Sequence, residues 1–452
     1  MSATSATQKG DSAVIAQYQE QFQHLSTDAE PAFVASQRKV GFAHFAKAGF
    51  PTPQDEEWRF TNVRRIAARA FDASTPTTAT DDAAIDRVLR QYAIAGAARL
   101  VFIDGMFDAK RSDTAPAGLG AGLASLRDTI SHNTAAVEGR LYSQITPTSG
   151  AFGGLNAAFF HDGAFVHIPR GAEAQAVIQI IYIATRANRL ISPRNVFIAE
   201  ENAGATIVEN YAATGDFDYL TNAVTEVITE PSGRIDHYKC QHESPSAFHI
   251  ATLSSQQDRD SDFRSQSLAF GARLMRYDMN PTLAGPGANC DLHGLSLGDQ
   301  QQLLDHHLRV EHAAPHCDSR EYFKGIYQDA SHGVFTGRIH VHQIAQKTDA
   351  KQTNMSLLLS DKAKVDTRPQ LEIFADDVKC THGATIGQLD ADAMFYLRSR
   401  GIPAETARSL LVYAFASEVL ADIRVDALRD MGRTWLLERL PDSDVLRGLE
   451  QS

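Results

Sequence analysis

The sequence predicts a mainly β protein in which a long strand-rich core is flanked by helical regions at both ends. Two observations support this fold class. From about residue 96 to residue 388, short segments rich in β-branched and aromatic residues follow one another, and Gly, Asn, Asp or Pro separates them. Before and after this region, apolar residues recur instead at spacings of three and four, which is typical of amphipathic helices.

The N-terminal region, residues 1–95, is predicted to be helical. The segments QKGDSAVIAQYQEQF and PAFVASQRKVGFAHFAKAGF carry apolar residues at helical spacing. A polar stretch at residues 72–82, DASTPTTATDD, follows these segments. Its content of Ser, Thr, Asp and Pro predicts a linker or an exposed loop.

The strand-rich region, residues 96–388, contains segments such as AVIQIIYIA, RNVFIAE and QLEIFA. No amphipathic helix of crossover length recurs regularly between them, which argues against a doubly wound α/β sheet. A sandwich, barrel, propeller or β-helix remains. The turns NAGATIV and PSGRIDH are alike, but such turns recur at uneven spacing. This pattern suits a β-helix whose coils vary in length, and a jelly roll would produce a similar one.

The C-terminal region, residues 389–452, is again predicted to be helical. Asp390 can cap the start of a first helix, and Gly401 is placed to end it. A second helix would carry an apolar stripe that includes Leu411 and Phe415, and VDALRDMGRTWLLERL can add a third. Two interpretations of this apolar surface stay open. It packs against the strand region, or it docks a partner protein.

Length, composition and charge narrow the class of protein further. The chain has 452 residues, of which 43% are hydrophobic and 22% charged, so we expect a globular protein of two to three domains. Lys and Arg number 43 against 55 Asp and Glu, and this net charge of −12 argues against nucleic acid or an anionic membrane as the main partner.

The sequence shows neither a membrane span nor a secretory signal. Its most apolar stretch, residues 176–184, is too short to cross a bilayer, and the N-terminus lacks the pattern of a signal peptide. Four widely spaced cysteines without a CxxC motif do not form a disulfide framework. We therefore expect free thiols in a reducing compartment, the cytoplasm.

Cys380 and His382 form the first candidate site, in the segment DVKCTHG. On a strand, residues two apart point to the same face, which would place thiol and imidazole roughly 7 Å apart. Such donors suit zinc, iron or an iron–sulfur cluster. Two ligands cannot close a four-coordinate site, so further ligands must come from elsewhere in the chain or from a partner. The alternative is a buried Cys beside a surface His.

His340 and His342 form a second candidate site. An H-x-H pair on a strand is how cupin-like barrels present two metal ligands, and a metal-dependent cupin-like enzyme is therefore the alternative function. No acidic residue follows at a spacing that would complete a facial triad. An alternating His-Val-His segment is also compatible with a plain solvent-exposed strand face.

The C-terminal third resembles the SufB/SufD family of iron–sulfur cluster assembly proteins. The resemblance rests on the long run DVKCTHGATIGQLDADAMFYLRSRGIPAETARSLLVYAFASEVL. Near the other end of the chain, EEWRFTNV at residues 56–63, with its Trp-Arg-x-Thr sequence, looks like an element of the same family. The order of helical, strand-rich and helical regions also fits, so the resemblance covers nearly the whole chain.

The resemblance implies a right-handed parallel β-helix for residues 96–388. It also implies a non-catalytic scaffold subunit that pairs with a SufB-like subunit and contributes to iron acquisition and nascent cluster formation at their interface. A SufC-like ATPase would bind the C-terminal helical region, with Leu411, Phe415 and Trp435 as apolar anchors. A cysteine desulfurase and a sulfur-transfer protein would be indirect partners, and the isolated chain can form a homodimer.

The resemblance also implies a role for individual residues. In this family the His of the KCxHG element lies at the subunit interface and is implicated in cluster formation, and that position is His382 here. Cys380 matches the Cys of the same element. Iron or a transient iron–sulfur cluster would be shared with the SufB-like subunit. A reduced flavin is associated with the family's complex, although the sequence identifies no flavin site.

Overall fold

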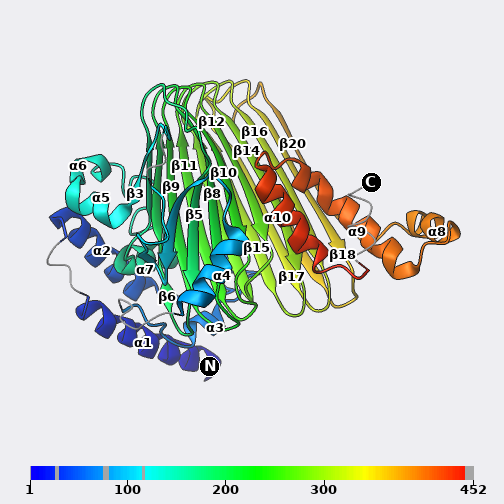
Figure 1. Cartoon of the computed structure of the whole chain (residues 1–452), viewed down its shortest axis with the longest axis horizontal. Coiled ribbons are helices and arrows are strands. Elements are labelled where there is room, and N and C mark those ends of the chain that lie inside the picture. The colour runs from blue at the N-terminus through cyan, green and yellow to red at the C-terminus, as the bar shows by residue number, and fades with distance from the viewer. Residues whose placement is uncertain (1, 26–29, 75–80, 115–117, 443–452) are drawn as a thin grey trace.

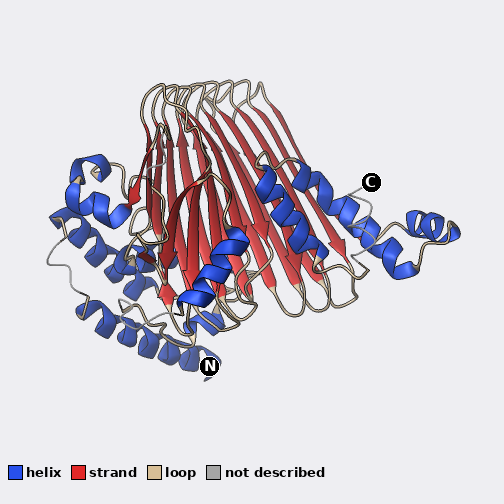
Figure 2. Ribbon diagram, in the orientation of Figure 1, coloured by secondary structure: helices blue, strands red, loops and turns tan. Residues whose placement is uncertain are grey.

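The computed structural model describes residues 2–25, 30–74, 81–114 and 118–442. The predicted class is confirmed, because the molecule is a parallel β-helix with helices at both ends (Figures 1 and 2). Residues 75–80 of the predicted linker and residues 443–452 of the predicted C-terminal region lie outside the described residues. The jelly-roll interpretation is wrong, because the long strands pair in parallel, with antiparallel pairing only at β1–β2 and β3–β4 among the named strands.

Two long sheets form the walls of the β-helix. The first sheet contains, in spatial order, β2 (Met106–Phe107), β1 (Ala98–Ile103), β5 (Ile178–Ala184), β8 (Gly204–Ala213), β10 (Arg234–Gln241), β12 (Asp262–Ala269), β14 (Asn289–Gly298), β16 (Asp318–Tyr327), β18 (Asp349–Leu358) and β20 (Lys379–Gly387). The second sheet contains β19 (Lys364–Ile373), β17 (His332–Val341), β15 (Leu303–His312), β13 (Leu274–Leu283), β11 (Phe248–Gln257), β9 (Leu220–Thr229), β7 (Arg194–Ala199), β4 (Ala164–Ile168) and β3 (Gly122–Ser125), with β6 (Leu190–Ile191) also pairing with β9.

The chain alternates between the sheets, so each coil contributes one strand to each wall. Coil length varies, which explains the uneven turn spacing in the sequence. Asp262 pairs with Asn289, 27 residues later, whereas Asp318 pairs with Asp349, 31 residues later. The register between neighbouring strands is nevertheless continuous, so equivalent side chains stack in rows along the axis.

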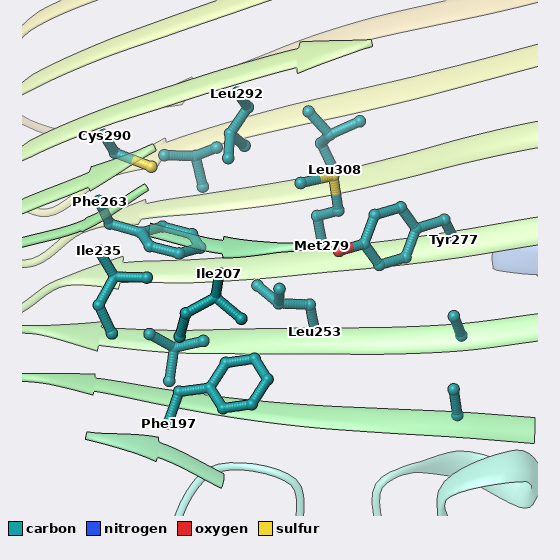
Figure 3. Packing of buried hydrophobic residues seen from close by; sticks show 14 of the residues in the cluster. Phe197, Ile207, Ile235, Leu253, Phe263, Tyr277, Met279, Cys290, Leu292 and Leu308 are labelled. Carbon is teal, nitrogen blue, oxygen red and sulfur yellow. The ribbon is translucent and has the colours of Figure 1, made fainter. Parts of the chain in front are cut away.

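An apolar core fills the space between the two walls. Phe263, Cys290 and Leu292 enter it from the first sheet, and Leu253 and Leu308 enter from the second (Figure 3). Side chains alternate between the two faces of a strand, so the intervening residues point outward. The interior rows are long and mostly buried, and they make the β-helix a stiff rod in which each coil packs on the next.

Helices cover the outer faces of both sheets. The N-terminal region contains α1 (Ser2–Gln23), α2 (Ala32–Ala48), the short 3₁₀ helix η1 (Glu56–Trp58), α3 (Arg64–Ala67) and α4 (Asp82–Tyr92). The C-terminal region contains α8 (Ala391–Ser399), α9 (Ala404–Ala421) and α10 (Asp426–Leu437). Residues of α4, α9 and α10 share one apolar cluster with the first sheet, so the apolar stripe of the last helices packs mainly against this chain's own strands.

Three helices interrupt the region that the sequence predicts to be strand-rich. They are α5 (Leu126–His132), α6 (Thr134–Val137) and α7 (Gly150–Phe159). The Ser125 side chain caps α5 by accepting a hydrogen bond from the backbone N–H of Asp128. Helix α7 is apolar around most of its circumference, because it is buried between α2 and the second sheet. The sequence of α7 therefore lacks the polar residues that would mark the solvent-exposed face of an amphipathic helix.

Candidate functional site at the open end of the β-helix

The two sheets end in exposed strands at the C-terminal end of the rod. Strand β20 is the last strand of the first sheet and β19 the last of the second. Most β20 residues are exposed and β19 is only half-buried, whereas β5 and β7 at the other end are buried throughout. Each terminal strand thus presents a row of backbone N–H and C=O groups that no neighbouring strand pairs within the described chain.

Cys380 and His382 both lie on β20, so the strand that was assumed in assigning them to one face is present. Cys380 is in register with Ala350 of β18, and His382 with Gln352. Ala350 belongs to the apolar core, so the side chains of Cys380 and His382 point to the inner side of the last coil. Among the described residues no further coil covers this side, and His382 is exposed.

His382 has no side-chain hydrogen bond or ion pair with any residue that the structure describes, so its imidazole is available to a ligand. Cys380 is half-buried against the edge of the core. Burial raises the pKa of the Cys380 thiol above its ordinary value, only partly opposed by a hydrogen bond from the Ala350 backbone. The thiol must therefore lose its proton when it binds a metal ion. The pair offers two donors and leaves the remaining positions of a metal site to another chain.

A row of polar side chains continues inward from His382. Gln352 donates a hydrogen bond to Glu321, which is fully buried in the preceding coil. Burial raises the pKa of Glu321 to about 8, although the bond from Gln352 lowers it. Glu321 consequently holds a proton at neutral pH, which lets the carboxyl group remain inside the rod without a counter-charge.

His340 and His342 lie on the outer face of the second sheet, away from the interior. These strands belong to a β-helix and not to the barrel that the cupin-like interpretation requires, and the barrel is therefore wrong. The structure nevertheless brings an acidic residue to the pair, because Glu311 of β15 is in register with His340 of β17. Sequence reasoning missed Glu311 because its proximity depends on the length of the intervening coil.

The predicted partner anchors have different environments. Leu411 and Phe415 are partly exposed and line an apolar groove of about 280 Å³ with Met355 and Leu357. Trp435 is 2% exposed and packs against Tyr92, His242 and Phe270, so its ring is part of this chain's own core. We therefore place the candidate docking surface around Leu411 and Phe415 and leave Trp435 out of it.

Helix α8 carries two aromatic side chains that sequence reasoning did not single out. It extends away from the sheets at the end of the molecule opposite α1 (Figure 1). Phe395 is 74% exposed and Tyr396 is 57% exposed. Large aromatic residues rarely remain so exposed on a helix without a partner. Their signal in the sequence is the adjacent Phe-Tyr pair in DADAMFYLRSR.

This combination of a parallel β-helix, terminal helices and an exposed Cys–His pair agrees with the family comparisons. The family described as "SUF system FeS cluster assembly, SufBD core domain" matches residues 182–415. The family described as "SufBD protein N-terminal region" matches residues 9–180. The chain therefore belongs to the SufBD family of iron–sulfur cluster assembly proteins, and the resemblance seen in the sequence is confirmed.

Sequence similarity to individual relatives extends over most of the chain. It is 32% identical over 417 residues to the iron–sulfur cluster assembly SufBD family protein slr0076 of Synechocystis, which covers 90% of this chain and 91% of that protein. It is 29% identical over 430 residues to the iron–sulfur cluster assembly protein SufD of Escherichia coli, covering 93% and 96%. The Bacillus subtilis protein of the same name is 26% identical over 279 residues, covering 61% and 63%.

The helices contain no candidate for a membrane span. Across the part of the chain that the structure describes, none is both long enough and apolar enough to cross a bilayer.

Proposed function

We propose that this chain is the SufD-type scaffold subunit of a SufBCD-type assembly complex and acts in the cytoplasm without catalysing a reaction of its own. It pairs with a SufB-like subunit through the open end of the β-helix and binds a SufC-like ATPase through its C-terminal helices. One observation carries the proposal: Cys380 and His382 face the uncovered side of the last coil, where both sheets end in exposed strands.

The shape of the open end supports pairing with another β-rich subunit. Exposed strand edges bind added strands through main-chain hydrogen bonds, and the side chains beside them select the partner. A SufB-like subunit that continues one or both sheets would also bring its own ligands next to Cys380 and His382. In the absence of that subunit, a second copy of this chain can occupy the same edges as a homodimer.

The chemistry of the pair suits a site for transient cargo. Iron and sulfide are substrates of the assembly, and the growing cluster leaves the complex when it is complete. A neutral imidazole at His382 binds iron but carries no charge of its own, so it holds iron less firmly than a thiolate ligand does. Burial raises the pKa of the Cys380 thiol, so a proton competes with the metal for this sulfur and favours release of the cluster.

The ATPase is proposed to dock on α8 and the adjoining groove. The exposed Phe395 and Tyr396 lie on α8, and the groove lined by Leu411 and Phe415 is bounded by α9 and the outer face of β18 and β20. The groove therefore connects the docking surface to the strand that carries His382. A movement of the ATPase can be transmitted to the subunit interface through this contact.

The decisive experiment is His382→Ala in the reconstituted complex of this chain, a SufB-like subunit and a SufC-like ATPase. We expect iron and acid-labile sulfide per complex to fall at least severalfold, while the complex itself still assembles. Thr381→Ala is the matched control, because Thr381 is the adjacent exposed residue and points to the opposite face of β20. Unchanged iron and sulfide in the His382 variant would refute the proposed role.

A further inference from the structure

The outer face of the second sheet carries a second group of metal-binding side chains. His340 points outward because Ile339 and Val341, on either side of it, are buried in the core. His342 lies two residues further along and on the same side, and the two rings stack with centroids 4.8 Å apart and planes 20° apart. Glu311 on the neighbouring strand completes the group.

One carboxylate oxygen is common to both imidazoles. Oε1 of Glu311 lies 2.7 Å from Nε2 of His342 and 3.6 Å from Nδ1 of His340. The potential ligand atoms of the three residues all lie within 4.8 Å of one another. Metal–ligand bonds of about 2.0–2.2 Å require donor atoms roughly 3–3.5 Å apart, so small side-chain rotations would bring all three onto one ion.

From this geometry we propose that Glu311, His340 and His342 bind one divalent transition-metal ion of the Zn²⁺ or Fe²⁺ class. Two imidazoles and one carboxylate on one side of the ion form a set that leaves positions open for water or a further ligand. The site is separate from the Cys380–His382 pair, because it lies outside the second sheet whereas that pair faces the inside of the last coil. It does not depend on the proposed role in cluster assembly.

An unsatisfied polar atom supports a ligand at this position. Nδ1 of His340 is shielded from solvent and has no hydrogen-bond partner among the described residues, since its two neighbouring carboxylates are each 3.6 Å away. Buried polar atoms without partners are rare in folded proteins. Coordination of an ion by this nitrogen, or by the opposite nitrogen with Nδ1 then hydrogen-bonded to Glu372, would remove the deficit.

The surrounding charges leave room for a cation. Two arginines lie nearby, but each is matched by a carboxylate: Arg338 lies 2.6 Å from Glu372, and Arg309 lies 3.5 Å from Oε2 of Glu311. Oε1 of Glu311 remains directed at the imidazoles.

The site also has access to solvent. Glu311, Arg309 and Arg338 line a groove of about 500 Å³ that runs past η1 and the start of α7. His342 is itself partly exposed. An ion can therefore reach the three ligands without an opening of the β-helix.

The test is a metal titration of the full-length chain, freed of metal with a chelator and measured without any partner protein. Isothermal titration with Zn²⁺ should show one ion per chain, and Co²⁺ should give a visible spectrum of a site with nitrogen and oxygen ligands. The double variant His340→Ala/His342→Ala should bind Zn²⁺ at least about a hundredfold more weakly, since the loss of two direct ligands should exceed the roughly 10–100-fold effect of losing a group that only supports a ligand. Zn²⁺ should also raise the Tm of the wild type but not that of the variant.

His332→Ala is the matched control. His332 lies on the same strand, faces outward and pairs with Asp366 at 2.7 Å, and its register neighbours on the two adjacent strands are Leu303 and Lys364 in place of further ligands. Zn²⁺ binding should be unchanged in this variant. If the double variant fails to fold, Glu311→Gln takes its place, with a changed Co²⁺ spectrum expected.

Three results would overturn the proposal. They are the absence of stoichiometric Zn²⁺ binding by the wild type, binding that survives in the double variant, and binding that disappears only when Cys380 and His382 are replaced. The titration contains no sulfide and no partner, so its failure leaves the proposed assembly role to be judged by its own experiment.

Discussion

The terminal strands at the two ends of the β-helix differ in length and in pairing direction. At the N-terminal end, the first sheet finishes in β2 with two residues and the second in β3 with four, and both of these strands pair antiparallel. At the C-terminal end, β19 has ten residues and β20 has nine, and both pair in parallel with the body of the rod. Short, reversed edge strands hinder the addition of another strand, and long regular ones invite it.

The side chains show the same contrast. Near the N-terminal end, Glu226 and Arg194 form a fully buried ion pair at 2.6 Å. Glu226 also accepts hydrogen bonds from the backbone of Tyr142, Gln144 and Ile145, which ties the segment before α7 to the second sheet. At the open end, Lys347 and Asp377 form an ion pair in which both side chains are more than half exposed. One end is closed by this chain alone, whereas the other is left uncovered by the described residues.

Breaking the buried ion pair between Arg194 and Glu226 should have the largest effect on stability. Glu226→Gln leaves the Arg194 guanidinium buried without its counter-charge, and such losses destabilise proteins by about 3–5 kcal/mol. Chemical denaturation followed by circular dichroism would measure the change. Lys347→Met at the open end is the control, with an expected change below about 1 kcal/mol because its ion pair is exposed. Equal effects of the two substitutions would remove the contrast between the ends.

Glu321 should make the free energy of unfolding depend on pH. Its pKa is about 8 in the folded chain, raised by burial, against an ordinary value of 4.5. Between these values the unfolded state releases the proton while the folded state keeps it, so this group's contribution to stability is greatest below pH 4.5 and is lost as the pH rises through 8. Glu321→Gln removes the titrating group, and the variant should gain on the order of a few kcal/mol relative to wild type at pH 8.5.

The measurement is the difference in unfolding free energy between this variant and the wild type at pH 5 and at pH 8.5. The difference should be small at pH 5 and larger at pH 8.5. Glu138→Gln, which replaces an exposed carboxylate near the N-terminal end, should show the same small difference at both pH values. A constant difference for Glu321→Gln would show that Glu321 is already ionised at neutral pH.

Blocking the exposed edge of β20 should weaken subunit pairing without unfolding the rod. The Lys379 N–H donates to Thr348, and the main-chain groups of successive strand residues point to alternate sides, so the N–H of Ala384 points to the free edge. Proline at position 384 therefore removes no bond to β18. The preceding residue, Gly383, has open space around it and accommodates the restriction that proline imposes.

We expect Ala384→Pro to lower the affinity for a SufB-like subunit about tenfold or more, which corresponds to roughly 1.4 kcal/mol. Surface plasmon resonance with the purified subunits would measure it, and Ala384→Ser is the control that keeps the N–H. Unaltered affinity of the proline variant would place the interface elsewhere on the molecule.

Local sequence patterns were sufficient to predict those features whose structure depends on residues close together in the chain. Asp390 was predicted as a helix cap, and it caps α8 by accepting hydrogen bonds from Asp392 and Ala393. The two-residue spacing of Cys380 and His382 places both on one face of β20. The inward direction of His382 was not predictable, because it follows from the register of β20 on β18. The exposure of His382 follows in turn from the position of β20 as the last strand of the first sheet in the described part of the chain.

Contacts between coils could not be read from the chain. Glu311 and His340 lie 29 residues apart and meet only because one particular coil has that length. Trp435 is a residue type that often anchors a partner protein, but here it is buried, because α10 packs on the first sheet beside α4. Helices α5–α7 were missed for a related reason: α5 and α6 are short, and α7 is too apolar to show a polar face.

The smallest effect on stability, and a clear one on binding, is expected at α8. Phe395 is 74% exposed, and none of the residues of α8 is buried, so Phe395→Ser should change the unfolding free energy by less than about 0.5 kcal/mol. If α8 docks the SufC-like ATPase, the same substitution removes an aromatic anchor and should weaken that complex by about 2 kcal/mol. Analytical ultracentrifugation of the two proteins would measure the loss. Arg398→Ser on the same helix is the control for a general change in α8, and equal ATPase binding by wild type and Phe395→Ser would exclude this aromatic face as the docking surface.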